Sequence, residues 1–119
     1  MSDTPVLKIQ LMLKGRPIKS YTFIKDVVTI GRDPGSDVVL DNMGVSRHHA
    51  RITCEAGRCI IEDAGSSNGT FVNGARVQRH ELLDADRIKI GKFDLHLGIG
   101  AHSASTDEVF RERVAVDED

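Results

Sequence analysis

The sequence predicts an all-β domain, an antiparallel sandwich, and three observations carry this expectation. Short runs rich in Val, Ile and Leu alternate at short intervals with clusters of Gly, Pro, Asn, Asp and Ser. No segment up to Leu97 has the apolar spacing of an amphipathic helix. The chain has one Tyr, four Phe and no Trp, so its core must be aliphatic, and β-branched aliphatic residues favour strands.

In the first part of the chain, each expected strand is bounded by turn residues. Residues 7–13 alternate in polarity and are followed by a turn at 14–17. Further strands are expected at 18–24, 27–30 and 38–40. The last two are separated by Asp33-Pro34-Gly35-Ser36, in which four consecutive residues favour a turn.

A hairpin is expected from residues 49–54 and 59–62, with Ala56-Gly57 as its two-residue loop. That register places Cys54 directly opposite Cys59. The face that they share also carries Ala50, Ile52 and Ile61. We interpret the pair as two buried thiols that act as small apolar side chains, in preference to a disulfide or a metal pair. No further Cys completes a zinc set.

The last expected strands are 70–72 and 75–78, joined by Asn73-Gly74, followed by 87–90 and 92–97. Asn and Gly both tolerate the positive φ angles of a tight hairpin turn. After Leu97 the sequence becomes small and polar, then charged. The expected organisation is a flexible N-terminus (1–6), one domain (7–97), and a linker with a charged C-terminal tail (98–119), in which a short helix over 106–114 is an alternative.

Length and charge exclude several classes of function. A chain of 119 residues suits one domain that buries its core without disulfides or metals. Sixteen basic and 18 acidic residues give a net charge of −2, so no basic field is present to hold nucleic acid. No apolar run is long enough to cross a bilayer, and the N-terminus does not resemble a signal peptide. We therefore expect a cytoplasmic monomer without nucleic-acid or membrane partners.

Three short polar clusters lie between the expected strands, each at a strand end or in a turn. They are Gly31-Arg32, Ser46-Arg47-His48-His49 and Ser66-Ser67-Asn68-Gly69-Thr70. Each cluster carries a compact donor, which is a guanidinium, a hydroxyl or a side-chain amide. A scaffold that gathers these groups at one loop-bearing end forms a small anion site. Such a site suits a phosphate better than it suits a catalytic reaction.

The order and spacing of these clusters resemble the forkhead-associated (FHA) domain, a phosphothreonine-binding family. The resemblance covers the motifs from Gly31 to Asn73-Gly74, and the strand pattern extends it from about Leu7 to Leu97. It implies a β-sandwich of about eleven strands with its binding loops at one end. It also implies a phosphothreonine-dependent interaction module in Ser/Thr kinase signalling. The implied partner is a phosphothreonine-containing protein or a Ser/Thr kinase.

The candidate anion site consists of Arg32, Ser46, Arg47, Ser67 and Asn68. A phosphothreonine carries roughly −1.5 to −2 charges and three acceptor oxygens, so its binder needs charge and directed donors. Arg32 and Ser46 resemble the family's phosphate-binding Arg and Ser, and Arg47 matches a position that contacts the phosphate or the peptide. Ser67 offers a second hydroxyl. Asn68 resembles the Asn that holds the ligand main chain.

Six further residues are expected to support this site structurally. They are Gly31, His49, Gly69, Thr70, Asn73 and Gly74. His49 is expected to brace the loops through a ring nitrogen. Because adjacent residues on a strand point to opposite faces, His48 and His49 are not expected to chelate one ion. The sequence predicts neither a metal nor a cofactor.

Other interpretations of the same residues remain open. Arg32 alone could be a surface residue, and Ser46 or Asn68 alone could be turn residues. An enzyme is not expected, since no Cys lies beside a phosphate loop and no paired carboxylates or metal set is present. A phospho-independent interaction domain of the same fold is the main alternative. Regulation by a phosphorylated Thr4 or Thr106 of the same protein is an additional hypothesis.

Overall fold

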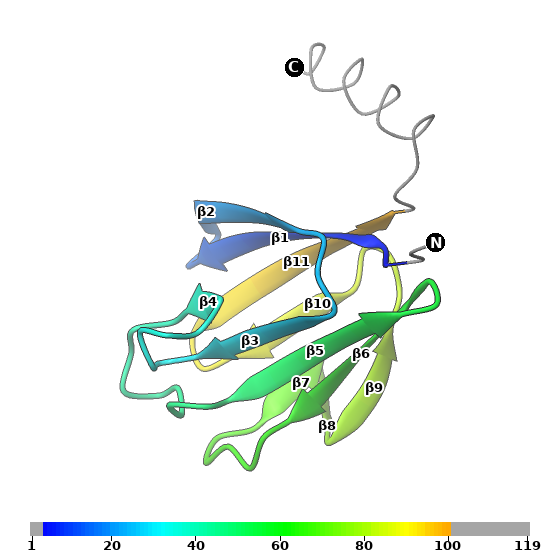
Figure 1. The fold of residues 1–119 in the computed structure, drawn as a ribbon. Coiled ribbons are helices and arrows are strands. Elements are labelled where there is room, and N and C mark those ends of the chain that lie inside the picture. Colours follow the sequence, from blue (N-terminus) through cyan, green and yellow to red (C-terminus); the bar gives the residue numbers. More distant parts are fainter. Residues whose placement is uncertain (1–3, 101–119) are drawn as a thin grey trace.

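The computed structural model describes residues 4–100, which form a β-sandwich of two sheets (Figure 1). The strands are β1 (Val6–Leu13), β2 (Arg16–Phe23), β3 (Val27–Gly31), β4 (Val38–Val39), β5 (Ala50–Glu55), β6 (Arg58–Asp63), β7 (Thr70–Val72), β8 (Ala75–Val77), β9 (Arg79–Leu82), β10 (Arg87–Ile90) and β11 (Phe93–Gly100). The six-stranded sheet has the order β2-β1-β11-β10-β7-β8, and the five-stranded sheet has the order β4-β3-β5-β6-β9. The predicted all-β sandwich is confirmed. Among the described residues no helix is long and apolar enough to cross a membrane.

Two features of the sheets differ from the sequence-based expectation. The β3–β4 pair is parallel, so the five-stranded sheet is mixed rather than wholly antiparallel. The strand β9 was not predicted, because Arg79, His80 and Glu81 give no β signal of their own. It forms because the chain crosses from one sheet to the other at Gln78 and pairs with β6.

The core is aliphatic, as the composition indicated. Alternate residues of the central strands point between the sheets, for example Phe93, Leu95 and Leu97 of β11. The largest fully buried apolar side chains are Leu7, Ile9, Ile30, Leu40, Ile52, Ile61, Ile88, Ile90 and Leu95. Burying each such side chain contributes about 1.5–3 kcal/mol, which fixes the register of the strands and therefore the places where the loops begin.

Tight hairpin turns set three of the strand pairings. The central residues of all three have positive φ angles: Lys14-Gly15 (52° and 77°), Ala56-Gly57 (52° and 77°) and Asn73-Gly74 (50° and 90°). Two consecutive positive φ angles define the turn whose twist matches that of the flanking strands. Lys14 and Ala56 are less suited to this conformation than Asn73, because each has a Cβ that is crowded in the left-handed region and neither has the short polar side chain with which Asn bonds locally.

The cysteine prediction was half correct. Cys54 pairs with Cys59 across β5 and β6, as the two-residue loop required, and both are buried. The two residues form a disulfide rather than the expected free thiols. Directly opposed residues of an antiparallel pair project to the same side, and their Cα atoms here are 4.1 Å apart. The prediction placed the two residues opposite each other but favoured free thiols, because two cysteines do not form a framework of paired cysteines.

The last strand extends beyond Leu97, the residue at which the sequence was expected to leave the domain. Residues 98–100 continue β11 and pair with the first residues of β1, Val6 opposite Gly100 and Lys8 opposite Gly98. Glycine is depleted in strands, so Gly98 and Gly100 were interpreted as the start of a linker. The pairing with β1 outweighs that low propensity. The expected helix and tail beyond residue 100 lie outside the described residues.

The loops that carry the polar clusters lie at one end of the sandwich. Figure 1 shows the β3–β4 and β4–β5 loops on the left, with the β6–β7 loop below them. The first and last described residues, Thr4 and Gly100, lie at the opposite end, where β1 begins and β11 ends. The long strands therefore separate the candidate anion site from both ends of the described chain.

Candidate functional site

Three loops meet at the short segment 44–46, which precedes β5. The Nε of Arg32 donates to the Val45 carbonyl over 3.0 Å. The Nδ2 of Asn68 donates to the Gly44 carbonyl over 3.0 Å. The backbone N–H of Ser67 donates to the Ser46 Oγ, also over 3.0 Å. Residues from the β3–β4, β4–β5 and β6–β7 loops are thus brought together at one point.

Gly31, the last residue of β3, lets Arg32 approach this segment. A Cβ on Gly31 would lie 2.0 Å from the Arg47 carbonyl oxygen, so no other residue fits. The backbone N–H of Arg32 donates to the Ser46 carbonyl over 3.0 Å. Among residues 4–100 the half-buried Arg32 side chain is bonded through Nε alone, so both terminal nitrogens of its fork are available to a ligand.

The hydroxyl groups of the site keep their donor capacity. Ser46 Oγ accepts the Ser67 N–H, and its own hydrogen remains available. Ser67 is exposed. Arg47 is also exposed, and its backbone carbonyl accepts the N–H of Asp33 over 3.2 Å. The cation of Arg47 therefore stands at the rim of the site rather than in its floor.

His49 connects two of the loops from beneath. The ring is fully buried, and its Nδ1 accepts the backbone N–H of Ser46 over 3.1 Å. Since Nδ1 accepts, Nε2 carries the ring proton, and it donates to the Gly69 carbonyl over 2.8 Å. One neutral imidazole thus fixes Ser46 relative to the loop that bears Asn68.

Asp63 organises the β6–β7 loop, and sequence reasoning missed it. Its carboxylate accepts hydrogen bonds from the Ser66 hydroxyl (2.6 Å), the Thr70 hydroxyl (2.7 Å), and the backbone N–H groups of Gly65 (3.0 Å) and Ser66 (2.9 Å). Burial by itself raises the pKa of Asp63, but the hydrogen bonds from Ser66 and Thr70 outweigh it, and the net pKa is lowered. The Asp-x-x-Ser spacing was the available signal, because Asp side chains often bond the backbone just after them.

The other supporting residues act at different distances from the site. Gly69 has a φ of +94°, and a Cβ there would lie 2.7 Å from the Arg76 Nε, which packs over this turn. Thr70 is buried against Asp63.

Asn73 lies in the β7–β8 turn, where its side chain bonds Asp86 (2.9 Å) and the N–H of Arg87 (3.0 Å). Asn73 and Gly74 thus shape the strand framework and not the loop junction.

The two adjacent histidines lie in different environments. His48 is exposed, whereas His49 is buried. In the part of the chain that the structure describes, no three His, Cys, Asp or Glu side chains gather as metal ligands would.

The comparisons with known proteins identify the family of this chain. The family model of the FHA domain matches residues 28–91. The glycogen accumulation regulator GarA of Mycolicibacterium smegmatis is 41% identical over 87 residues, which cover 71% of this chain and 55% of GarA. The oxoglutarate dehydrogenase inhibitor of Corynebacterium efficiens is 40% identical over 95 residues, covering 78% of this chain and 67% of the inhibitor. The chain therefore spans only a little over half the length of GarA.

The fold is also that of solved FHA structures. EmbR of Mycobacterium tuberculosis, in complex with a low-affinity phosphopeptide, superposes with a TM-score of 0.73 at 32% identity. The match covers 82% of this chain and 25% of EmbR. Because the family model matches residues 28–91, more than half of the chain, and the fold is the same sandwich, the chain belongs to the FHA-domain family.

Proposed function

We propose that this chain is a phosphothreonine-dependent interaction module in Ser/Thr kinase signalling, which binds phosphopeptides at the candidate anion site without chemistry of its own. The observation that carries the proposal is the junction at segment 44–46. Arg32, Ser46 and Asn68, which are distant in sequence, all contact it or belong to it through hydrogen bonds of about 3 Å.

The free donors at this junction suit a phosphate ester. The two terminal nitrogens of Arg32 form a fork that matches two phosphate oxygens, and the Ser46 hydroxyl supplies a directed third donor. Ser67 and Arg47 stand at the rim with further donors. One N–H of the Asn68 amide donates to the Gly44 carbonyl, and its Oδ1 and second N–H can bind the main chain of a peptide.

The relatives indicate the class of partner. Two of them are named as regulators of metabolism, a glycogen accumulation regulator and an oxoglutarate dehydrogenase inhibitor, and EmbR was solved with a phosphopeptide. We infer that this chain binds a phosphothreonine-containing protein, an enzyme or a Ser/Thr kinase, as a reversible regulator. Micromolar affinity, about −8 kcal/mol, suits such a contact.

Calorimetry with a phosphothreonine peptide chosen from an oriented library tests the proposal. Wild type is expected to bind the phosphorylated peptide and to show no measurable binding of the unphosphorylated one. Arg32→Ala should abolish measurable binding, because the charge and the fork are lost together. Arg58→Ala is the matched control, since Arg58 is an exposed Arg at the opposite end of the sandwich, where it pairs with Glu81.

Three outcomes would count against the proposal. Equal binding by the Arg32→Ala variant would place the phosphate elsewhere. Equal affinity for phosphorylated and plain peptides would favour a phospho-independent interaction domain. Release of inorganic phosphate from the peptide would reveal an enzyme.

A further inference from the structure

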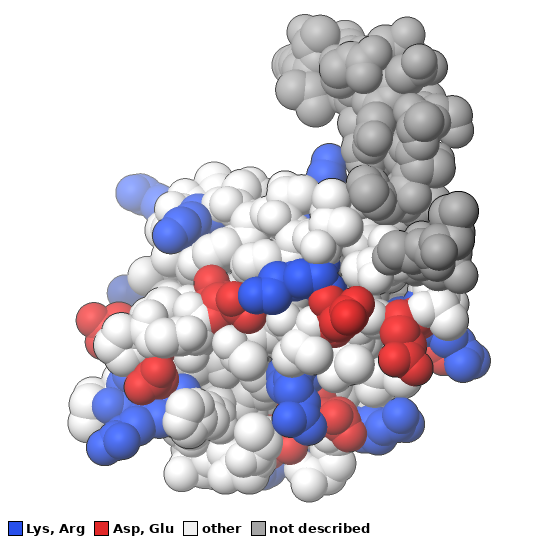
Figure 2. All heavy atoms as spheres, viewed as in Figure 1, with Lys and Arg blue, Asp and Glu red and all other residues white. Residues whose placement is uncertain are grey.

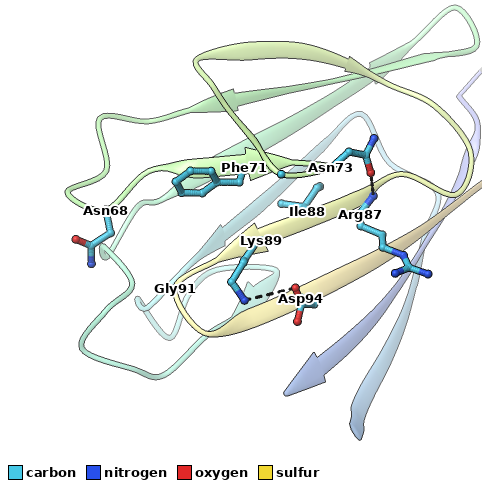
Figure 3. A pocket seen from close by; sticks show the side chains of 9 residues that line it. Asn68, Phe71, Asn73, Arg87, Ile88, Lys89, Gly91 and Asp94 are labelled. Carbon is cyan, nitrogen blue, oxygen red and sulfur yellow. Dashed lines mark hydrogen bonds and ion pairs between the residues drawn. The ribbon is translucent and has the colours of Figure 1, made fainter. Parts of the chain in front are cut away.

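A groove runs from Asn68 across the solvent face of the six-stranded sheet (Figure 3). Its volume is about 720 Å³. We call it the β10 groove, and its principal side chains are Asn68, Phe71, Asn73, Arg87, Lys89 and Asp94. Asn68 is shared with the candidate anion site, so the groove opens where that site ends.

The groove contains an aromatic side chain that the core does not use. Phe71 lies between Thr70 and Val72, whose side chains are buried, and therefore points to the outer face of the sheet. It stands opposite Lys89 on β10 and opposite Arg76 on β8. A half-exposed Phe between two cations offers a contact for an apolar side chain from another molecule.

The charges of this face are unbalanced. Arg76, Arg87 and Lys89 are accompanied by Asp94, which lies 3.7 Å from Lys89. Within residues 4–100 neither Arg76 nor Arg87 forms an ion pair. Figure 3 shows the Arg87 guanidinium at the side of the groove with no partner drawn to it.

The opposite face of the sandwich provides the contrast. Arg51 and Arg79 both pair with Glu62, and Arg58 pairs with Glu81. In Figure 2 blue and red side chains alternate over the face that carries β3, β5 and β6. Within the described residues, the outer face of the six-stranded sheet therefore carries cations without matching carboxylates, whereas the arginines on the outer face of the five-stranded sheet are paired.

We propose that the β10 groove docks a second segment of the same phosphoprotein whose phosphothreonine occupies the anion site. This proposal rests on the proposed function. The segment has an apolar side chain, which packs on Phe71, flanked by carboxylates, which pair with the two cations that line the groove, Arg87 and Lys89. Asn68 connects the anion site with the groove, because it belongs to both. A peptide whose main chain binds Asn68 can therefore continue into the groove.

The experiment uses a short phosphothreonine peptide that wild type binds, and the same peptide extended by Asp-Glu-Phe-Asp-Glu at either end. Two control extensions are Lys-Lys-Phe-Lys-Lys and Asp-Glu-Ser-Asp-Glu. Affinities are measured by calorimetry for wild type, for Arg87→Glu with Lys89→Glu, and for the charge-matched control Arg51→Glu with Arg58→Glu. Circular dichroism and thermal unfolding verify that each variant is folded.

The acidic aromatic extension at one end should tighten binding by wild type about tenfold, from two exposed ion pairs and one apolar contact. The serine extension should give a smaller gain, and the basic extension none. The Arg87→Glu, Lys89→Glu variant should lose the gain while binding the short peptide as wild type does. The control pair should keep the gain.

Three results would overturn the proposal: no gain from the acidic extension at either end, a gain that survives in the groove variant, or a gain lost equally in the control pair. None of these depends on whether binding of the short peptide requires its phosphate. Failure of wild type to distinguish the phosphorylated short peptide from its plain form would instead refute the proposed function.

Discussion

Replacing His49 by Phe tests whether one buried imidazole holds the two binding loops together. Phe keeps a planar ring in a fully buried position but makes neither hydrogen bond. The Ser46 N–H and the Gly69 carbonyl would lose their partners, and each unsatisfied buried group costs about 1–3 kcal/mol. The greater apolarity of Phe offsets part of this, so we expect a loss of about 3 kcal/mol. The melting temperature should then fall by about 10–20 °C.

The assay is chemical denaturation of wild type and variant, followed by calorimetry with a phosphothreonine peptide below the melting temperature. Affinity should also fall, because Ser46 and the turn at Gly69 are no longer held to one another. His48→Phe is the control, since His48 is exposed and its replacement should change the free energy of unfolding by less than about 0.5 kcal/mol. If the free energy of unfolding of His49→Phe lay within that same margin of the wild-type value, the two hydrogen bonds would not stabilise the fold.

Two further predictions concern the β6–β7 loop and the β5–β6 turn. Because the pKa of Asp63 is lowered in the folded protein, its contribution to stability is present above its ordinary pKa of 3.8 and lost as pH falls through the lowered value. Asp63→Asn should cost about 1–3 kcal/mol near neutral pH, and urea titrations at decreasing pH should show the difference from wild type shrinking below about pH 4. Ala56→Asn should stabilise by about 0.5–1 kcal/mol, because Asn tolerates the positive φ of 52° better than Ala does. Ala64→Asn, a change outside the positive-φ residues, serves as its control in thermal unfolding, and equal effects of the two would contradict this reasoning.

The fold was predictable where the information is local. The alternation of polar and apolar residues predicted β1 and β11. The two-residue loop at Ala56-Gly57 predicted the register that sets Cys54 opposite Cys59. The parallel pairing of β4 and the strand β9 depend on contacts between segments distant in sequence, which polarity patterns do not encode. The disulfide is an intermediate case: local turn signals predicted the register that places Cys54 opposite Cys59, but not the bond between them.

The candidate site shows the same division. Residue chemistry identified donors suited to an anion at Arg32 and Ser46, but their meeting at segment 44–46 follows from tertiary packing, and the family resemblance supplied that expectation. The hydrogen-bonding role of Asp63 was accessible from its spacing to Ser66 and was overlooked. The β10 groove was not accessible, because Phe71 and Lys89 become neighbours only through the pairing of β7 with β10.

The geometry of the sandwich also limits how the protein could recognise itself. Thr4 lies at the end opposite the anion site, where its hydroxyl donates to Asp26, and Thr106 lies outside the described residues. The seven steps from Gly100 back to Phe93 span about 23 Å along β11, at about 3.3 Å per residue. The six residues from Gly100 to Thr106 reach at most about 22 Å when fully stretched.

The segment from Gly100 to Thr106, even fully extended, would therefore end short of the loops. A phosphorylated Thr106 could not lie across the site of its own molecule. We expect recognition of this residue to occur between molecules. Kinase-treated protein should show concentration-dependent association by analytical ultracentrifugation, and Arg32→Ala should remain monomeric. A monomer at all concentrations, with its affinity for a phosphothreonine peptide lost on phosphorylation, would contradict the distance estimate and require a shorter path to the site.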